Sequence, residues 1–195
     1  MNPFNITDAR LEFTNIDNFI DGDELQHGIV FLNDEIDTCA VSKGVSQLDF
    51  VKRIGVKSVT LRINSPGGGV CNAFALYDKI KELENAGIPT TGVVIGSAAS
   101  AASMIVLQAC RYRTATPSSR LHLHEVSQWS FMEDMKTSKM EEDLAELNKL
   151  TDMVLTVLEK QTGHSKAEIK EFIYRKEKWL SAQEALDWKL IDSIV

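Results

Sequence analysis

One stretch of this 195-residue chain decides its fold: Val93-Val94-Ile95-Gly96-Ser97-Ala98-Ala99-Ser100-Ala101-Ala102-Ser103-Met104-Ile105-Val106-Leu107. The apolar residues up to Ile95 predict a buried strand, the Gly96-Ser97 pair predicts a turn, and a helical pattern follows. Ser100 is then expected where strand becomes helix, beside free backbone N–H groups and the positive end of the helix dipole. Such a position suits stabilisation of an oxyanion, although small residues also let a helix pack closely on a sheet.

Strands alternate with helices on both sides of this stretch. The apolar patterns predict helices between the first three strands, and the strands themselves are expected at residues 28–32, 59–63, 91–95 and 120–124. Strands and helices that alternate at this short spacing are typical of an α/β fold with a mostly parallel sheet.

Several helix ends carry capping signals. Asp37 is placed to cap the first of these helices. Two Ser-x-x-Glu quartets, at 165–168 and 181–184, are typical of capping boxes that open two further helices. Residues 131–162 are expected to form one long helix, because apolar and similar residues recur in steps of three and four at Met140, Leu144, Leu147, Thr151, Val154 and Leu158.

The bulk composition favours one domain that spans residues 1–195. The chain is 44% hydrophobic, and no linker, internal repeat or low-complexity tract interrupts it. A net charge of -7 without a dense Lys/Arg cluster argues against a nucleic-acid surface. The apolar runs are too short for a membrane span, and no secretory signal is visible. We therefore expect a cytoplasmic protein without membrane contact.

The three cysteines, Cys39, Cys71 and Cys110, are an odd number without C-x-x-C spacing. This pattern predicts reduced thiols in the core, and neither a disulfide nor a zinc site. No metal and no organic cofactor are expected.

Two glycine-rich loops follow two of the strands, at Gly67-Gly68-Gly69 and at Gly96. Glycines let a backbone present N–H groups to a ligand at close range. A phosphate site is disfavoured, because the first loop lacks the Walker lysine and the G-x-G-x-x-G spacing. Stabilisation of an anion at a carbonyl centre remains, and that chemistry needs a nucleophile and a base.

Two histidines, His122 and His124, are two apart on a predicted strand, so both face the same way while Leu121 and Leu123 face the core. Periodicity does not choose between them, and either one alone is more often a surface or packing histidine. A serine nucleophile needs an adjacent base and a third group that orients the base. The chain offers the order serine, histidine and downstream acid, with many acids to choose from.

Four motifs in register resemble the proteolytic subunit of the Clp protease family. They are Arg62-Ile63-Asn64-Ser65-Pro66-Gly67-Gly68, Gly96-Ser97-Ala98-Ala99-Ser100, Leu121-His122-Leu123-His124 and Leu180-Ser181-Ala182-Gln183-Glu184-Ala185-Leu186. Their order and intervals also match, from about Gly28 to Ile194. The resemblance implies the spiral α/β fold that this family shares with the crotonases. It also implies a serine endopeptidase that cleaves unfolded polypeptides through an acyl-enzyme.

The resemblance assigns roles to single residues. It implies that Ser100 is the nucleophile, that His124 is the general base, and that the N–H groups of Gly68 and Ala101 hold the oxyanion. The family's acid is usually an aspartate shortly before the Leu180 motif, and this chain has Glu177 there. Glutamate is one methylene longer, and the alternative interpretation of Glu177 is one more solvated charge in a charged segment.

The resemblance also implies partners. Helix 131–162 is then a protruding handle through which two rings interlock, with heptameric rings stacked in pairs around polypeptide substrates. ATP is consumed by a partner AAA+ unfoldase, since nothing in this chain binds nucleotide. Two segments depart from the family: residues 125–129 replace a glycine-rich strand that lines the substrate groove, and residues 1–27 do not resemble the axial loops. Docking of an unfoldase is therefore left open.

Three alternatives stay open at this point. The run from Ala98 to Ser103 and Trp179 also resemble the phage-encoded branch, the Clp-like head maturation proteases. A crotonase-type acyl-CoA enzyme predicts glutamates near Ser100 and His124, where only Glu125 occurs. A non-catalytic ring subunit is favoured only by Glu177, because such subunits typically lose the serine or the histidine.

Overall fold

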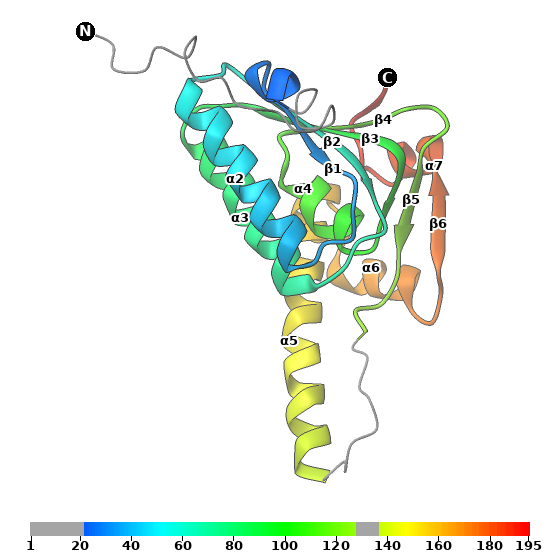
Figure 1. Cartoon of the computed structure of the whole chain (residues 1–195). Helices are drawn as coiled ribbons and strands as arrows, with labels where there is room; N and C mark the ends of the chain where they lie inside the picture. The colour runs from blue at the N-terminus through cyan, green and yellow to red at the C-terminus, as the bar shows by residue number, and fades with distance from the viewer. Residues whose placement is uncertain (1–21, 128–136) are drawn as a thin grey trace, which may run out of the picture.

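The structure is a computed structural model that describes residues 22–127 and 137–195. Strands and helices alternate along the chain, which confirms the predicted α/β fold (Figure 1). The elements are β1 (Ile29–Leu32), α2 (Thr38–Ile54), β2 (Val59–Ser65), α3 (Val70–Asn85), β3 (Thr90–Ala99), the π-helical turn η2 (Ala102–Val106), α4 (Leu107–Ala109), β4 (Tyr112–Ala115), β5 (Arg120–Leu123), α5 (Thr137–Thr162), α6 (Lys166–Ile173), β6 (Lys178–Ser181), α7 (Ala182–Asp187) and β7 (Ser193–Ile194).

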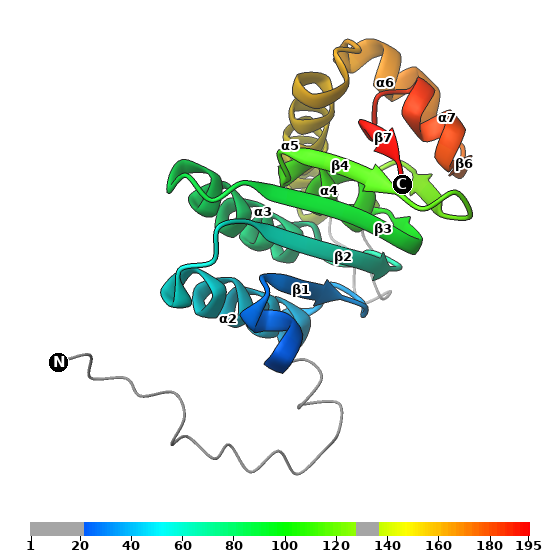
Figure 2. The same ribbon diagram turned by 90° about the horizontal axis from the view of Figure 1, so that it is seen from above.

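The sheet is parallel along its main path, in the order β1-β2-β3-β4-β7. Figure 2 shows these strands side by side, with α2 and α3 together on one side of them. Strand β5 leaves this path, because it pairs in parallel with the end of β3 and antiparallel with β6. The antiparallel β5–β6 ribbon and the end of β3 together frame the site described below.

Strand β3 is longer than predicted. The expected turn at Gly96 is instead a bulge: Gly96 has φ +85°, and the register against β2 shifts there. Residues 91–94 pair with β4, and residues 97–99 pair with β5. The predicted end of the strand at Ile95 is therefore wrong. Pairing of residues 97–99 with two distant segments outweighs the local turn tendency of glycine.

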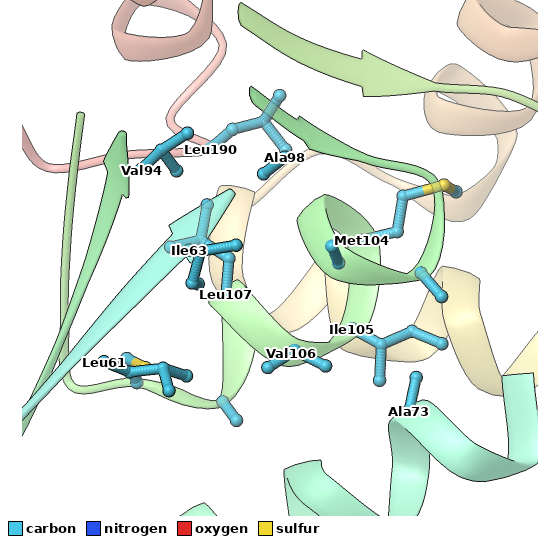
Figure 3. Packing of buried hydrophobic residues seen from close by; sticks show 14 of the residues in the cluster. Leu61, Ile63, Ala73, Val94, Ala98, Met104, Ile105, Val106, Leu107 and Leu190 are labelled. Carbon is cyan, nitrogen blue, oxygen red and sulfur yellow. The ribbon is translucent and has the colours of Figure 1, made fainter. Parts of the chain in front are cut away.

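The helical segment after β3 lies inside the core. Met104, Ile105 and Leu107 are all less than 4% exposed, and Figure 3 shows this segment between the strands and α3. Burying a side chain of this size stabilises the fold by about 1.5–3 kcal/mol. The residue at the start of this segment, Ser100, is therefore carried on a firmly packed element.

The helix caps form as expected. The Asp37 carboxylate accepts the N–H of Ala40 at 2.8 Å. Reciprocal capping boxes at 165–168 and 181–184 open α6 and α7. Each satisfies backbone donors that the first helical turn leaves free.

Helix α5 has two unlike halves. Its C-terminal half packs on the body, where Val154 and Leu158 are buried, while its other half extends away from the body (Figure 1). Met140 and Leu144 on the extended half are 51% and 59% exposed. The predicted start of this helix, residues 131–136, lies outside the described residues, as do residues 1–21 of the N-terminal segment.

The cysteines agree with the sequence prediction only in part. Of the three thiols expected in the core, only Cys110 is buried, and burial raises its pKa to about 12. Cys39 and Cys71 are exposed, because the first turns of α2 and α3 direct them outward, so the prediction is wrong for both.

Within residues 22–127 and 137–195, no helix combines the length and apolar character that a membrane crossing requires.

Candidate active site

Ser100 occupies a strained turn between β3 and the helical segment. Its φ is +53°, a conformation that costs a residue with a side chain of order 1–3 kcal/mol. Surrounding hydrogen bonds hold it: the Ser100 N–H donates to the His122 carbonyl at 3.0 Å, and the Met104 N–H donates to the Ser100 carbonyl at 2.9 Å. The predicted position of Ser100 at the junction of strand and helix is confirmed by this geometry.

His124 lies directly beyond the end of β5. The ladder pairs Ala99 with His122, so the chain after β5 passes the Ser100 turn. The His124 Nε2 is 2.7 Å from the Ser100 Oγ. A hydroxyl and an imidazole nitrogen at this distance can exchange a proton, which is what an activated serine requires.

Two backbone N–H groups border the same space. Gly68 forms a parallel bridge with Ile36, in which the Ile36 N–H donates to the Gly67 carbonyl at 2.7 Å and the Gly69 N–H donates to the Ile36 carbonyl at 3.1 Å. These bonds leave the Gly68 N–H on the side away from Ile36. The N–H of Ala101 belongs to a first helical turn, where no intrahelical acceptor exists. Both residues line the cavity that contains Ser100 and His124.

The glycine loop touches the Ser100 turn. A methyl group on Gly67 would lie 2.5 Å from the Ala99 carbonyl oxygen and 2.7 Å from the Ser100 Cβ, and φ at Gly67 is +90°. Only glycine combines this backbone angle with such a close approach. The loop therefore sets the shape of the turn that carries the serine.

The cavity has a volume of about 350 Å³. Its apolar lining comes from five side chains on four separate segments of the chain, and Glu35 adds a carboxylate to it. Sequence reasoning missed this lining, because its members are far apart in the chain and share no local pattern: Val70, Met104, Ile105, Val126 and Val154. The space can accept part of a peptide beside Ser100.

The structure does not join Glu177 to His124. The Glu177 Oε2 lies 2.5 Å from the Nε2 of His122, the other histidine of the pair. The buried His122 Nε2 has no hydrogen-bond partner among the described residues, so this contact is a close approach and not a hydrogen bond. Glu177 precedes β6 and its side chain is 71% exposed, so it is free to reach the neighbouring ring.

His122 is buried although it was expected to share the outward face of its strand. It is 7% exposed, and its ring stacks on Trp179 at 4.5 Å between centroids. Burial lowers the pKa of His122, and it outweighs the nearby Glu177 carboxylate, which acts in the opposite direction. Trp179 belongs to β6, a strand that the sequence analysis missed.

Comparison with known proteins gives consistent matches. A family model described as Clp protease matches residues 18–195. The ATP-dependent Clp protease proteolytic subunit 1 of Protochlamydia amoebophila (strain UWE25) is 31% identical over 180 residues, which cover 89% of this chain and 85% of that protein. The protein of the same name from Chlamydia muridarum (strain MoPn / Nigg) is 29% identical over 182 residues, covering 92% of each chain.

Proposed function

This chain belongs to the Clp protease family and is a serine peptidase, and from that premise we propose that Ser100 is its nucleophile and His124 its general base. The observation that carries the assignment is the 2.7 Å separation of the His124 Nε2 and the Ser100 Oγ. The strained backbone of Ser100 supports it, because strained backbone conformations persist only where the surrounding structure fixes them, and such residues cluster at active sites.

The proposed reaction is acyl transfer. The Ser100 Oγ attacks the scissile carbonyl carbon while its proton passes to the His124 Nε2. Collapse of the tetrahedral intermediate breaks the C–N bond, and the leaving amine takes the proton back from His124. Water then attacks the acyl-enzyme with His124 again as base, which releases the second product and restores the serine.

We assign the oxyanion site to the N–H groups of Gly68 and Ala101. Both residues border the cavity beside Ser100, and neither N–H is drawn into the bridge or into the helix. Donors held in place before the reaction stabilise the developing charge without the cost of reorganisation.

Glu177 is the acid that we assign to this site. The β5–β6 ladder ends with Leu123 opposite Lys178, and one more step of the same register would set His124 opposite Glu177. Its carboxylate contacts His122, the neighbour of the proposed base. A negative charge here stabilises the imidazolium that forms when His124 accepts the proton.

We further propose that the chain acts on polypeptides as a cytoplasmic ring assembly with an ATP-consuming unfoldase as partner. The two relatives are named as proteolytic subunits of an ATP-dependent protease. The extended half of α5 supports assembly, because exposed Met140 and Leu144 leave apolar surface uncovered. Leu147→Asp should split large particles into smaller rings, as measured by the particle mass in light scattering.

Asn148→Asp, at an exposed polar position, is the control and should leave the particle mass unchanged.

The peptidase assignment is tested with a short fluorogenic peptide, which needs no unfolding before cleavage. Ser100→Ala should lower turnover by several orders of magnitude, as removal of a triad member does, with folding intact. Ser97→Ala, three residues earlier on β3, should cost little. Hydrolysis that survives in Ser100→Ala would refute the assignment, and a wild-type protein without hydrolysis would favour the non-catalytic ring subunit.

A further inference from the structure

Four side chains form a row on one face of the β5–β6 ribbon: Glu177, Trp179, His122 and His124. The antiparallel ladder sets Trp179 opposite His122, and His124 follows two residues later on the same face. The His122 ring stacks on Trp179 with centroids 4.5 Å apart and planes 20° apart. It stacks on His124 with centroids 5.2 Å apart and planes 11° apart. The His122 ring therefore stacks with two nearly parallel rings.

This row constrains the ring that faces the serine. An imidazole can take the serine proton only when its plane is turned so that Nε2 points at the hydroxyl. In the structure the His124 Nε2 does so at 2.7 Å, while the flat side of the ring rests on His122. Rotation of the His124 ring about its Cβ–Cγ bond would break this stacking. His122 thus opposes the motion that would misalign the base.

His122 also contacts the other parts of the site. Its carbonyl accepts hydrogen bonds from the Ser100 N–H at 3.0 Å and from the Ser103 hydroxyl at 2.5 Å. Its ring nitrogen lies 2.5 Å from the Glu177 carboxylate. One buried residue therefore touches the backbone of the serine, the ring of the base and the acid.

We propose that His122 is a positioning residue of this peptidase, whose ring aligns His124 by stacking and through which Glu177 acts on the site. The inference rests on the proposed roles of Ser100 and His124, and it adds a residue to them. It replaces a direct contact between acid and base with a relay of two steps, Glu177 to His122 and His122 to His124.

The electrostatics of the row are compatible with this role. The charged or titratable groups that face His122 are Glu177, before β6, and His124, directly after β5, while Trp179, Ala99 and Ser103 contribute no charge. Burial lowers the pKa of His122, so its neutral form is favoured. A neutral ring does not repel the imidazolium that His124 becomes during catalysis, whereas a second cation beside it would disfavour that charge.

The test separates stacking from contact with the acid. His122→Phe keeps a flat ring of similar size but removes the nitrogen that faces Glu177, and His122→Ala removes both. Each is made alone and together with Glu177→Gln, and kcat and KM are measured per active site titrated with a fluorophosphonate. Titration removes misfolded enzyme from the comparison, so a purely structural role would leave kcat per site unchanged.

We expect His122→Phe to lower kcat by roughly a hundredfold, as Glu177→Gln does, and His122→Ala by roughly a thousandfold. KM should stay unchanged in both, because a lost alignment acts on the chemical step. Glu177→Gln should lower kcat in the wild-type background and should have no further effect beside His122→Phe, because residues that act through one another are not additive. Trp179→Ala, at a half-exposed position, loosens the same stack without altering His122, and should lower kcat by a few-fold.

Equal losses in His122→Phe and His122→Ala would show that stacking is not the role. A full loss from Glu177→Gln in the His122→Phe background would show that the acid acts on His124 directly. If both His122 variants fail to fold, an unchanged kcat in Trp179→Ala would overturn the proposal. Failure of the proposed function itself is recognised separately, by activity that survives in Ser100→Ala.

Discussion

The site has two walls that are built in different ways. One wall is backbone, made of the loop Gly67–Gly69 and the first turn at Ala101. The other wall is side chains, made of the rings and the carboxylate on the β5–β6 ribbon. The backbone wall is specified by a short run of glycines, whereas the side-chain wall exists only after two strands far apart in sequence have paired.

This difference predicts how each wall responds to substitution. A Cβ at Gly67 or Gly68 would meet backbone atoms closer than 3.0 Å, and backbone cannot move aside as a flexible side chain can. On the ribbon a ring can be exchanged for another ring, and an exposed carboxylate can be shortened. We therefore expect abrupt losses at the first wall and graded losses at the second.

The largest effect is expected at the backbone wall. Gly67→Ala should lower turnover of the fluorogenic peptide by roughly a thousandfold, because the new methyl group displaces the Ser100 turn and the oxyanion donors together. Gly87→Ala is the matched control: its φ is +82°, but nothing lies within 4 Å of the added methyl group. The control should lose about 1 kcal/mol of stability through backbone strain and keep its activity. Similar turnover in the two variants would show that the close approach at Gly67 does not matter.

An intermediate effect is expected at the acid of the side-chain wall. Glu177→Gln should keep the fold and lower turnover by roughly a hundredfold, because the negative charge that acts on His124 through His122 is lost. Glu177→Asp retains the charge and should be tolerated. Both are measured as kcat on the fluorogenic peptide. A fully active Glu177→Gln would remove the carboxylate from the mechanism and leave a Ser–His dyad.

The smallest effect concerns stability and pH. Because burial lowers the pKa of His122 in the folded state, the unfolded chain binds a proton more readily than the folded chain. This contribution to stability is fully present above the ordinary histidine pKa of 6.5, and it is lost as the pH falls below that value. Urea unfolding from pH 7.5 to 5.5 should show a shallower decline in His122→Phe than in the wild type. Parallel declines would mean that His122 does not titrate in this way.

Much of the fold could be predicted from the sequence, because the signals that start its helices are local. Asp37 and the two Ser-x-x-Glu quartets set helix starts that the structure reproduces. The end of β3 was not accessible, since Gly96 ends a strand in isolation but forms a bulge when two distant segments pair with its neighbours. The short strands β4, β6 and β7 were missed for a similar reason, because pairing defines them more than composition does.

The candidate site could likewise be predicted only in part from the sequence. The small residues around Ser100 and the spacing of the histidines indicated a nucleophile and a base, and the resemblance favoured His124 over His122. The stack on Trp179 was not accessible, because it depends on the register of two strands. The contact of Glu177 with His122 was not accessible either, because the register alone would set Glu177 opposite His124.

The central claim is that Ser100 and His124 form one reacting pair, and covalent labelling tests it most directly. A fluorophosphonate should modify Ser100 alone, as identified by mass spectrometry of the digested protein, because only a serine with an adjacent base is sufficiently nucleophilic. His124→Ala should slow the labelling by several orders of magnitude, in parallel with peptide hydrolysis. A label on Ser97 or Ser103, or a labelling rate of Ser100 that does not change in His124→Ala, would contradict the account.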